Sequence, residues 1–333
     1  MEICGILLDL NHSIEAEILR IEHIKNRFPN ALLIGFLISD FNFLGSPSKY
    51  NKYHRTQVAL QHSIDLIIEI PNLLALQTLD QSTSHLAKLI QSVHVTQLFL
   101  LSESMQTEFL YQMAKLPIQI DRLKQSSFNL NNSLDELSYL HGPFYFNDLV
   151  AIGLLRTLDF TKTNIHFVKF NPLENEISSL KDYYPYLRSF IHLSSSTNLQ
   201  KIYGVPNGFA KKLKIANHEY ANYEDFFQSL ITKYTQFHHI QKVLIQIMAQ
   251  NSQYTFDSSH DSFIRILGFT SKGQAYLKEL KKQDLRIISV FHQLPIKVRE
   301  FSLQLITVYG LPFTIDTQKD LLKLELGSPI KKD

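Results

Sequence analysis

Hydrophobic residues in the first third of the chain form short, nearly continuous runs separated by longer amphipathic stretches. The runs cover residues 3–10, 31–38, 65–70 and 96–101. Runs of this length are typical of strands that are buried on both faces of a sheet. Between them, apolar residues recur at helical spacing over about 14–27, 48–62 and 73–92. The alternation predicts βαβ units with right-handed crossovers, and therefore a parallel, Rossmann-like α/β domain over residues 1–193.

From about residue 194 the pattern changes to helical spacing, and no convincing strand alternation appears. The helical segments cover 199–214, 223–232, 239–249 and 273–282. The hydroxyl groups of residues 194–197 can cap the helix that follows, so we place the domain boundary there. A mostly helical domain is expected over 194–333. Its last part, 313–333, reads as a helix or strand followed by a basic tail.

Composition narrows the class of protein. The 333 residues are 44% hydrophobic and 19% charged, which is enough for two soluble domains with their own cores. The one cysteine, Cys4, lies in the first apolar run and is expected to be buried. A single cysteine excludes a disulfide framework within the chain and a cysteine-based zinc cluster. No apolar stretch approaches the roughly 20 residues that span a bilayer, and the N-terminus lacks a signal sequence, so we expect a cytosolic protein.

The edge of the predicted sheet is the place to look for chemistry. Parallel sheets bind ligands at the carboxyl ends of their strands, where the N–H groups that open the next helix attract anions. The turn after the first strand has no glycine-rich loop, no histidine pair and no lysine before Arg20. It therefore offers few groups to hold phosphates. The loop 39–47 and residues 102–103 should overhang the same edge as Asn11.

Other constellations carry less weight. His218, His238, His239 and His260 do not suggest a metal site, because adjacent histidines on a helix point about 100° apart and no carboxylate stands at ligand spacing. The G-x-S-x-G elbow of a serine hydrolase does not occur. The tyrosines of 183–186 either stack nucleobases or pack a domain junction. A net charge of +2 neither requires nor excludes a nucleic-acid partner.

Several short motifs follow one another across about 270 residues. They are the opening strand with Asn11, Gly45-x-Pro47 with Lys52-x-x-Arg55-Thr56, the run 65–71, Phe99-x-x-Ser102-Glu103, Asn147-Asp148-Leu149, Ile202-Tyr203 with Gly208-Phe209, and Arg265-Ile266-Leu267-Gly268-Phe269 with Gly273-Gln274-x-Tyr276-Leu277. None is specific alone. In this order and spacing, the chain resembles the tRNA(Met) cytidine acetate ligase family.

The resemblance implies a fold, a reaction and a set of contacts. It implies a nucleotidyltransferase-like ATP-binding domain followed by a helical tRNA-binding domain. ATP, with Mg²⁺, activates acetate as acetyl-adenylate, and the acetyl group passes to the wobble cytidine of elongator tRNA(Met). The implied ATP-binding positions are Leu7, Leu8, Asp9, Asn11, Ile14, Glu17, Arg20, Leu101, Ser102, Asn147 and Lys181. The implied RNA-binding positions are Lys211, Lys212, Lys214, Lys233, Lys242 and Lys272.

The chain departs from the family where the chemistry lies. Ile14, Ala16 and Glu17 occupy the HxGH positions, whose histidines stabilise the departing pyrophosphate. Removing one such donor typically costs ~10²–10³ in rate, and Glu17 would repel phosphates. Leu101 stands where the family has a glycine, so a side chain lies where the backbone should approach the ligand. Lys181 stands where the family has an arginine, which keeps the positive charge but loses the bidentate guanidinium.

Two functions therefore follow from the sequence. One is the ATP-dependent ligase that the family resemblance implies. The other is a catalytically silent relative that keeps the fold and an RNA-binding surface, which the lost phosphate donors favour.

Overall fold

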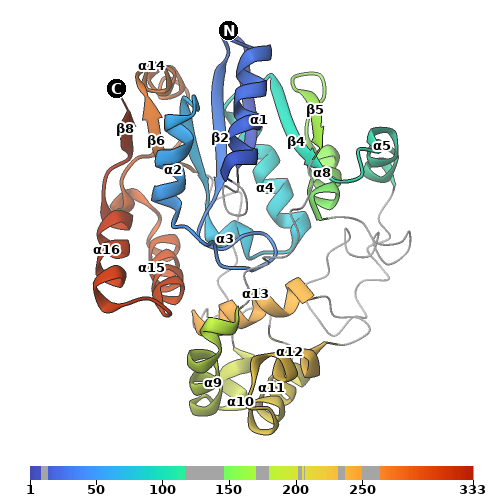
Figure 1. Cartoon of the computed structure of the whole chain (residues 1–333), viewed down its shortest axis with the longest axis vertical. Coiled ribbons are helices and arrows are strands. Elements are labelled where there is room, and N and C mark those ends of the chain that lie inside the picture. Colours follow the sequence, from blue (N-terminus) through green and yellow to red (C-terminus); the bar gives the residue numbers. More distant parts are fainter. Residues whose placement is uncertain are drawn as a thin grey trace.

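A sheet flanked by helices forms the upper part of the molecule, and a smaller group of helices lies below it (Figure 1). The computed structural model describes residues 1–8, 14–116, 146–169, 180–201, 205, 207–231, 237–249 and 263–332. The N- and C-terminal ends lie at the same end of the molecule, at the top of Figure 1. Asp9, Asn11, Lys233, His260 and the 202–203 motif lie outside the described residues.

The sheet is mostly parallel, as predicted. Its strands are β1 (Ile3–Leu8), β2 (Leu32–Ile38), β3 (Leu66–Ile70), β4 (Gln97–Ser102), β5 (Asn164–Lys169), β6 (Ile264–Thr270), β7 (Ile287–Ile288) and β8 (Ile330–Lys332). They are ordered β5-β4-β1-β2-β3-β6-β7, with β8 beside β6. Strands β1 to β5 pair in parallel, so the residues that follow β1, β2 and β4 share one edge. This confirms that the loop 39–47 and residues 102–103 overhang the same edge.

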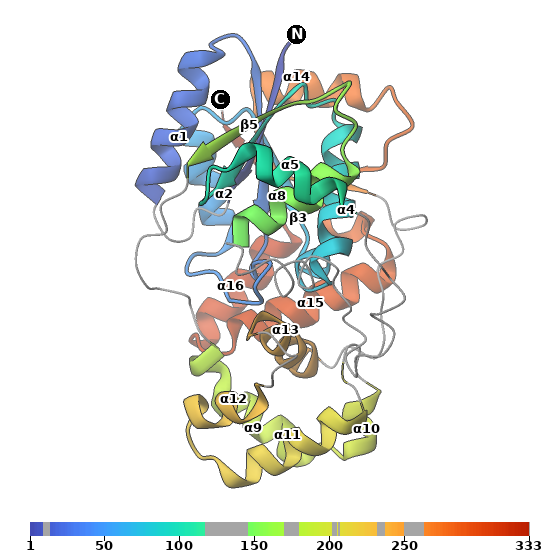
Figure 2. The same cartoon turned by 90° about the vertical axis from the view of Figure 1, so that its right-hand side faces the viewer.

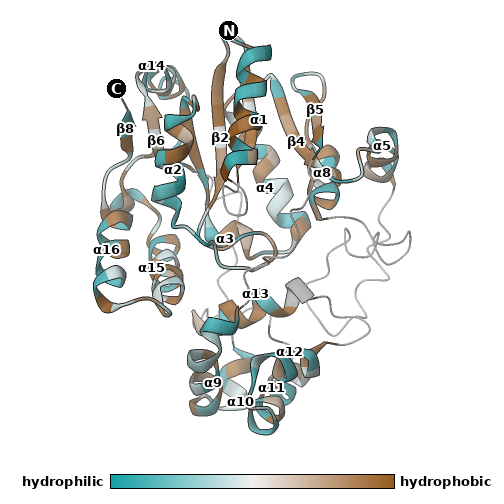
Figure 3. Cartoon of the chain, in the orientation of Figure 1, coloured by the Kyte–Doolittle hydropathy of each residue, from teal (hydrophilic) through white to brown (hydrophobic). Residues whose placement is uncertain are grey.

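Helices cover both faces of the sheet, which explains why its strands are so apolar. The helices of this part are α1 (Ile14–Arg27), α2 (Lys52–Gln61), α3 (Asn72–Ala75), α4 (Leu79–Ser92), α5 (Thr107–Lys115) and α8 (Phe146–Thr157). One core joins Cys4, Ile6 and Leu8 to α1 and α2, while the alternate residues of β2 pack against α4 and α8. Figures 2 and 3 show the helices around the strands and the mainly hydrophobic colour of the strands.

The expectation that no strand lies among the helices of residues 199–282 is wrong. Strand β6 runs antiparallel to β3, with Leu66 opposite Phe269, and β7 and β8 join β6. The helices around them are α14 (Ser271–Leu280), α15 (Ile296–Gly310) and α16 (Ile315–Leu326), with the short 3₁₀ helix Phe291–Gln293. The pairing of β6 with β3 joins segments far apart in the chain, so local periodicity does not reveal it.

The lower helices lie beyond the carboxyl edge of the sheet (Figure 1). They are Leu180–Tyr183 (3₁₀), α9 (Tyr184–Leu193), α10 (Ser196–Gln200), α11 (Asn207–Glu219), α12 (Tyr223–Leu230) and α13 (Phe237–Met248). Gly45 has φ +76°, and a Cβ there would lie 2.9 Å from the backbone nitrogen of Lys242 in α13. Tyr183 is buried and donates to the Tyr309 carbonyl at 3.0 Å, so it packs the junction.

The predicted boundary at 194–197 lies inside this lower group. Ser195 caps α10 by accepting from the Asn198 N–H at 3.1 Å, which confirms the capping role of the hydroxyls. The change from sheet to helices instead falls between β5 and residue 180. None of the helices in the described ranges combines the length and apolar character needed to cross a bilayer.

Candidate nucleotide site

The end of β1 and the start of α1 form one side of the candidate site. Leu8 is buried and Leu7 is half-buried at the carboxyl end of β1. Arg20 donates to the Leu7 carbonyl at 3.2 Å and forms an ion pair with Glu17 at 2.9 Å. Both side chains are less than 10% exposed. Arg20 is therefore engaged by the protein itself, and Glu17 is charge-matched within its own helix.

The HxGH positions carry no cation. Ile14 is half-buried, Ala16 is exposed, and Glu17 is buried in its pair with Arg20. An isoleucine and an alanine cannot donate side-chain hydrogen bonds to a phosphate. Among the described residues of this turn, Arg20 is the cationic side chain nearest in sequence to the end of β1.

Ser102 is held at the end of β4 by α8. Its hydroxyl donates to Asp148 Oδ1 at 2.6 Å, and the Ser104 N–H donates to Asp148 Oδ2 at 3.2 Å. The Met105 N–H donates to Ser102 Oγ at 2.9 Å. Ser102 is fully buried, and Leu101 before it is half-buried. The Ser102 side chain therefore shapes the turn and does not present its hydroxyl to solvent.

Glu103 and Asn147 lie together beside Ser102. Asn147 Nδ2 donates to Glu103 Oε1 at 2.8 Å. Burial raises the pKa of Glu103, and the nearby Asp148 carboxylate raises it further, while the Asn147 hydrogen bond opposes this. The sequence placed Ser102 and Glu103 at this edge and indicated Asn147 and Asp148 as a motif, but it did not predict that Glu103 and Asp148 hold Asn147 and Ser102. The signal available in the sequence was an acidic residue directly after a strand and another in the first turn of a helix.

Lys181 lies elsewhere. It belongs to the 3₁₀ turn before α9, and its Nζ pairs with Glu224 Oε1 of α12 at 2.8 Å. Both side chains are more than half exposed. The hydrogen bond to Glu224 raises the pKa of Lys181. The structure therefore does not bring Lys181 to Ser102 and Asn147.

A buried ion network lies at the carboxyl end of β3. Lys52 Nζ is 2.8 Å from Glu69 Oε1 and 2.7 Å from Glu325 Oε2. Arg265 NH1 is 2.8 Å from Glu69 Oε2 and 2.7 Å from Glu325 Oε1. Tyr53 donates to Glu325 Oε2 at 2.8 Å. All these side chains are less than 10% exposed, so α2, β3, β6 and α16 are joined by matched charges.

The charges of this network control each other's protonation. Burial alone would lower the pKa of Lys52, but the Glu325 and Glu69 carboxylates raise it above its usual value. Burial alone would raise the pKa of Glu325, but Lys52 and Arg265 lower it to about 2. Arg55 extends the network to the turn after β2 by donating to the Ser39 carbonyl at 2.6 Å. The motif Lys52-x-x-Arg55 therefore shapes this turn and holds the fold together.

The candidate RNA-binding lysines are not on one surface. Lys211 is exposed on α11, while Lys212 and Lys214 donate to the carbonyls of Leu230 at 3.2 Å and His192 at 3.1 Å. Lys242 is 2% exposed and donates to the Gln77 carbonyl at 2.7 Å, so its side chain is not on the surface where RNA was expected to bind. It is buried because α13 packs on the carboxyl edge of the sheet.

Lys272 lies at the opposite edge of the sheet. Its Nζ donates to the Ala31 carbonyl at 2.6 Å, just before β2, and is 3.6 Å from Asp65, just before β3. These are the amino ends of the strands. The structure therefore separates Lys272 from the lysines of α11.

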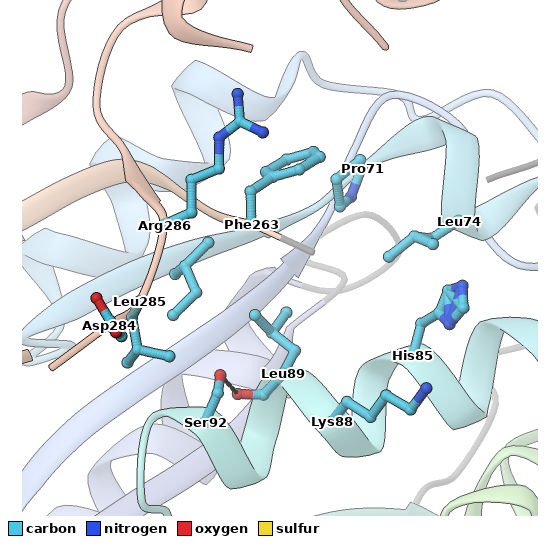
Figure 4. Close-up of a pocket in the computed structure, with 11 residues that line it drawn as sticks. Pro71, Leu74, His85, Lys88, Leu89, Ser92, Phe263, Asp284, Leu285 and Arg286 are labelled. Carbon is cyan, nitrogen blue, oxygen red and sulfur yellow. Dashed lines mark hydrogen bonds between the residues drawn. The ribbon is translucent and has the colours of Figure 1, made fainter. Parts of the chain in front are cut away.

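A cavity of about 180 Å³ lies between α4, the end of β3 and the segment before β7 (Figure 4). Leu89 and Leu285 contribute apolar walls, and Lys88 and Arg286 come from opposite sides. Burial lowers the pKa of His85, at its rim, to about 4. None of the residues predicted to bind ATP or RNA lines this cavity. Among the described residues, no group of three or more His, Cys, Asp or Glu side chains could hold a metal ion.

Comparisons with known proteins match most of the chain. The family model described as HIGH Nucleotidyl Transferase matches residues 1–141 and 158–320. The tRNA(Met) cytidine acetate ligase of Staphylococcus haemolyticus is 24% identical over 340 residues, covering 85% of this chain and 87% of that protein. The Oceanobacillus iheyensis protein of the same name is 22% identical over 407 residues, covering 99% and 100%. The predicted family resemblance is confirmed.

Two solved structures share the fold. The apo crystal structure (form I) of Thermotoga maritima TmcAL matches with a TM-score of 0.80, 16% identity and 99% coverage of both chains. The structure of the same protein bound with alpha-thio ATP (form II) matches with a TM-score of 0.78, 17% identity and 99% coverage of both chains. The α/β fold with its helical part is therefore that of a solved structure.

Proposed function

Because the chain belongs to the HIGH Nucleotidyl Transferase family, we propose that it is a cytosolic, ATP-dependent ligase acting on tRNA(Met). It activates acetate as acetyl-adenylate and transfers the acetyl group to the wobble cytidine. ATP is a substrate and binds, with Mg²⁺ on its phosphates, where β1 and β4 end. The relatives that match nearly the whole chain carry the name of this activity.

One observation carries the proposal. Asn147 and Ser102, which the family resemblance assigns to the nucleotide, are held together at the carboxyl end of β4 by Glu103 and Asp148. Strand β4 pairs with β1, so this group and the start of α1 are at one edge of the sheet. This is where parallel α/β sheets bind nucleotides.

The chemistry has two steps. An acetate oxygen attacks the α-phosphorus of ATP and the bond to pyrophosphate breaks. The cytidine N4 amine then attacks the acetyl carbonyl carbon, loses a proton, and AMP leaves. In the first step negative charge grows on the departing pyrophosphate, and cations or N–H donors must stabilise it. Among the described residues, Arg20 is the cation nearest in sequence to the end of β1, and because it pairs with Glu17 we expect this step to be slow.

Acetate-dependent exchange of labelled pyrophosphate into ATP tests the first step directly. The purified full chain is incubated with ATP, acetate and labelled pyrophosphate, with the Staphylococcus haemolyticus relative as a positive control. We expect exchange that requires acetate. No exchange, while the control is active, would reject the ligase function.

The ion pair between Glu17 and Arg20 favours a second candidate. With Ile14 and Ala16 at the HxGH positions and Arg20 neutralised, the chain is a silent relative that binds RNA without activating acetate. This candidate requires tRNA binding in the absence of pyrophosphate exchange. Filter binding with tRNA(Met), run beside the exchange assay, separates the two functions.

A further inference from the structure

The contact between Glu103 and Asn147 fixes which atom of Asn147 can face a ligand. Asn147 Nδ2 donates to Glu103 Oε1 at 2.8 Å, and the Asn147 backbone N–H approaches the same oxygen at 3.5 Å. An ionised carboxylate only accepts hydrogen bonds, so the amide must turn its Nδ2 toward Glu103. The carbonyl oxygen Oδ1 is then the part of this side chain that a ligand can contact.

The surrounding turn holds this arrangement in place. Glu103 reaches from the turn to α8, and Asp148 reaches from α8 back to Ser102 and Ser104. Met105 completes the turn with φ +53°, a left-handed conformation that is unfavourable for a residue with a side chain. Such a conformation persists only where neighbouring contacts enforce it, and strained residues of this kind concentrate at binding sites. Asn147 is therefore preorganised.

Glu103 also carries an unsatisfied oxygen. Its Oε2 is buried, and no residue in the described ranges donates a hydrogen bond to it. Burying a carboxylate with an unpaired oxygen destabilises the folded protein. An apolar residue would avoid this cost at a purely structural position. The retained carboxylate is explained if its acceptor character is needed to orient Asn147.

We propose that Glu103 is a positioning residue that makes Asn147 an acceptor for a hydrogen-bond donor of the bound nucleotide. The inference rests on the proposed function, which has ATP at this edge of the sheet. The donors of ATP are its ribose hydroxyls and the 6-amino group of adenine, whereas its ionised phosphates only accept. Asn147 therefore selects nucleotides that carry such a donor.

Binding of nucleotide analogues to the full chain tests the proposal. Calorimetric titrations would compare ATP with 2′-deoxy-ATP, 3′-deoxy-ATP and inosine triphosphate, each of which lacks one donor. We expect one analogue to bind about tenfold more weakly than ATP, because the Asn147 oxygen loses its donor. Which analogue is rejected identifies the ribose hydroxyl or the 6-amino group as the contact.

The variant Glu103→Gln tests the positioning role. Glutamine both donates and accepts, so it allows Asn147 to turn either Nδ2 or Oδ1 toward the ligand. We expect discrimination against the rejected analogue to fall to within about threefold. The matched control is Glu108→Gln, on an exposed residue of α5, which should keep the wild-type discrimination. Asn147→Ala, which removes no buried charge, should lose it as well.

The inference would be overturned if Glu103→Gln or Asn147→Ala still bound ATP more tightly than the rejected analogue by the wild-type factor. It would also be overturned if the wild-type chain did not bind ATP, or bound all the analogues as tightly as ATP. If Glu103→Gln does not fold, judged by circular dichroism, Asn147→Ala decides. The titrations need neither acetate nor tRNA. If the chain shows no pyrophosphate exchange but still distinguishes ATP from the analogue, only the proposed function is rejected.

Discussion

The buried network around Lys52 and the candidate nucleotide site lie at the same sheet edge, yet they use charge differently. In the network, Lys52 and Arg265 each contact two carboxylates that come from β3 and α16. At the site, Glu17 and Arg20 pair within one helix, and Glu103, just after β4, contacts the Asn147 amide of α8. The network joins cations to carboxylates of the protein, whereas Glu103 at the site contacts a neutral amide.

The difference shows what each region is suited to do. Buried charges whose partners are all within the protein hold the fold in one arrangement, because removing any one leaves another unpaired. A binding site must leave some groups for its ligand. We propose that Asn147 keeps its carbonyl oxygen for a ligand, whereas the Arg20 guanidinium already contacts Glu17 and the Leu7 carbonyl. On this proposal, the edge is better suited to hold a nucleoside than to stabilise a departing pyrophosphate.

The largest expected effect comes from breaking the network. Lys52→Met would leave Glu69 and Glu325 sharing Arg265 in a buried environment. We expect a loss of about 3–5 kcal/mol in the free energy of unfolding, measured by urea denaturation. The control Lys319→Met removes an exposed cation and should change stability by less than about 0.5 kcal/mol. A loss from Lys52→Met no larger than the control's would show that the network does not stabilise the fold.

Acid should weaken the same network. Lys52 and Arg265 lower the pKa of Glu325 to about 2 in the folded protein, whereas it is ordinarily 4.5. The stability that Glu325 contributes is therefore present above its unfolded pKa and is lost as the pH falls toward about 2. The loss should reach about 3 kcal/mol. Glu325→Gln should show a shallower fall of unfolding free energy between about pH 5 and pH 2, and equal slopes would contradict the assignment.

Restoring the HxGH motif should give the candidate site the phosphate-binding groups that it lacks. Ile14→His, Ala16→Gly and Glu17→His together replace an apolar side chain and a carboxylate with donors, and they free Arg20 from its pair. We expect pyrophosphate exchange to rise by up to about 10²-fold. Glu22→His, on an exposed residue of α1, is the control. No gain in exchange would mean that other parts of the site also differ from the active family pattern.

The smallest effect concerns RNA. Changing Lys211, Lys212 and Lys214 to alanine should weaken tRNA binding by about tenfold and reduce the slope of log affinity against log salt by up to about 2.7. The control changes Lys278, Lys281 and Lys282, which are exposed in the last turn of α14 and directly after it. Filter binding at several salt concentrations measures both the affinity for tRNA and its salt dependence. An unchanged slope in a folded variant would remove α11 from the RNA surface.

Much of the fold could be predicted because it depends on local pattern. The runs at 31–38, 65–70 and 96–101 became β2, β3 and β4, and the helical spacing at 14–27 became α1. β6 was missed because its seven residues include Arg265, which is buried only through its pairing with Glu69 and Glu325. Seen alone, an arginine in a short apolar run does not predict a sheet interior.

The sequence by itself determined the parallel sheet and its carboxyl edge, since these follow from periodicity and residue type, and its family resemblance identified the side chains at the HxGH positions. Tertiary structure alone decided which charges remain available. Lys242 is buried because its own helix, α13, packs on the sheet edge, Lys181 pairs with Glu224, and Glu103 meets Asn147 only when β4 and α8 pack. The charge of a side chain is set by its chemistry, but its availability depends on neighbours that are distant in the chain.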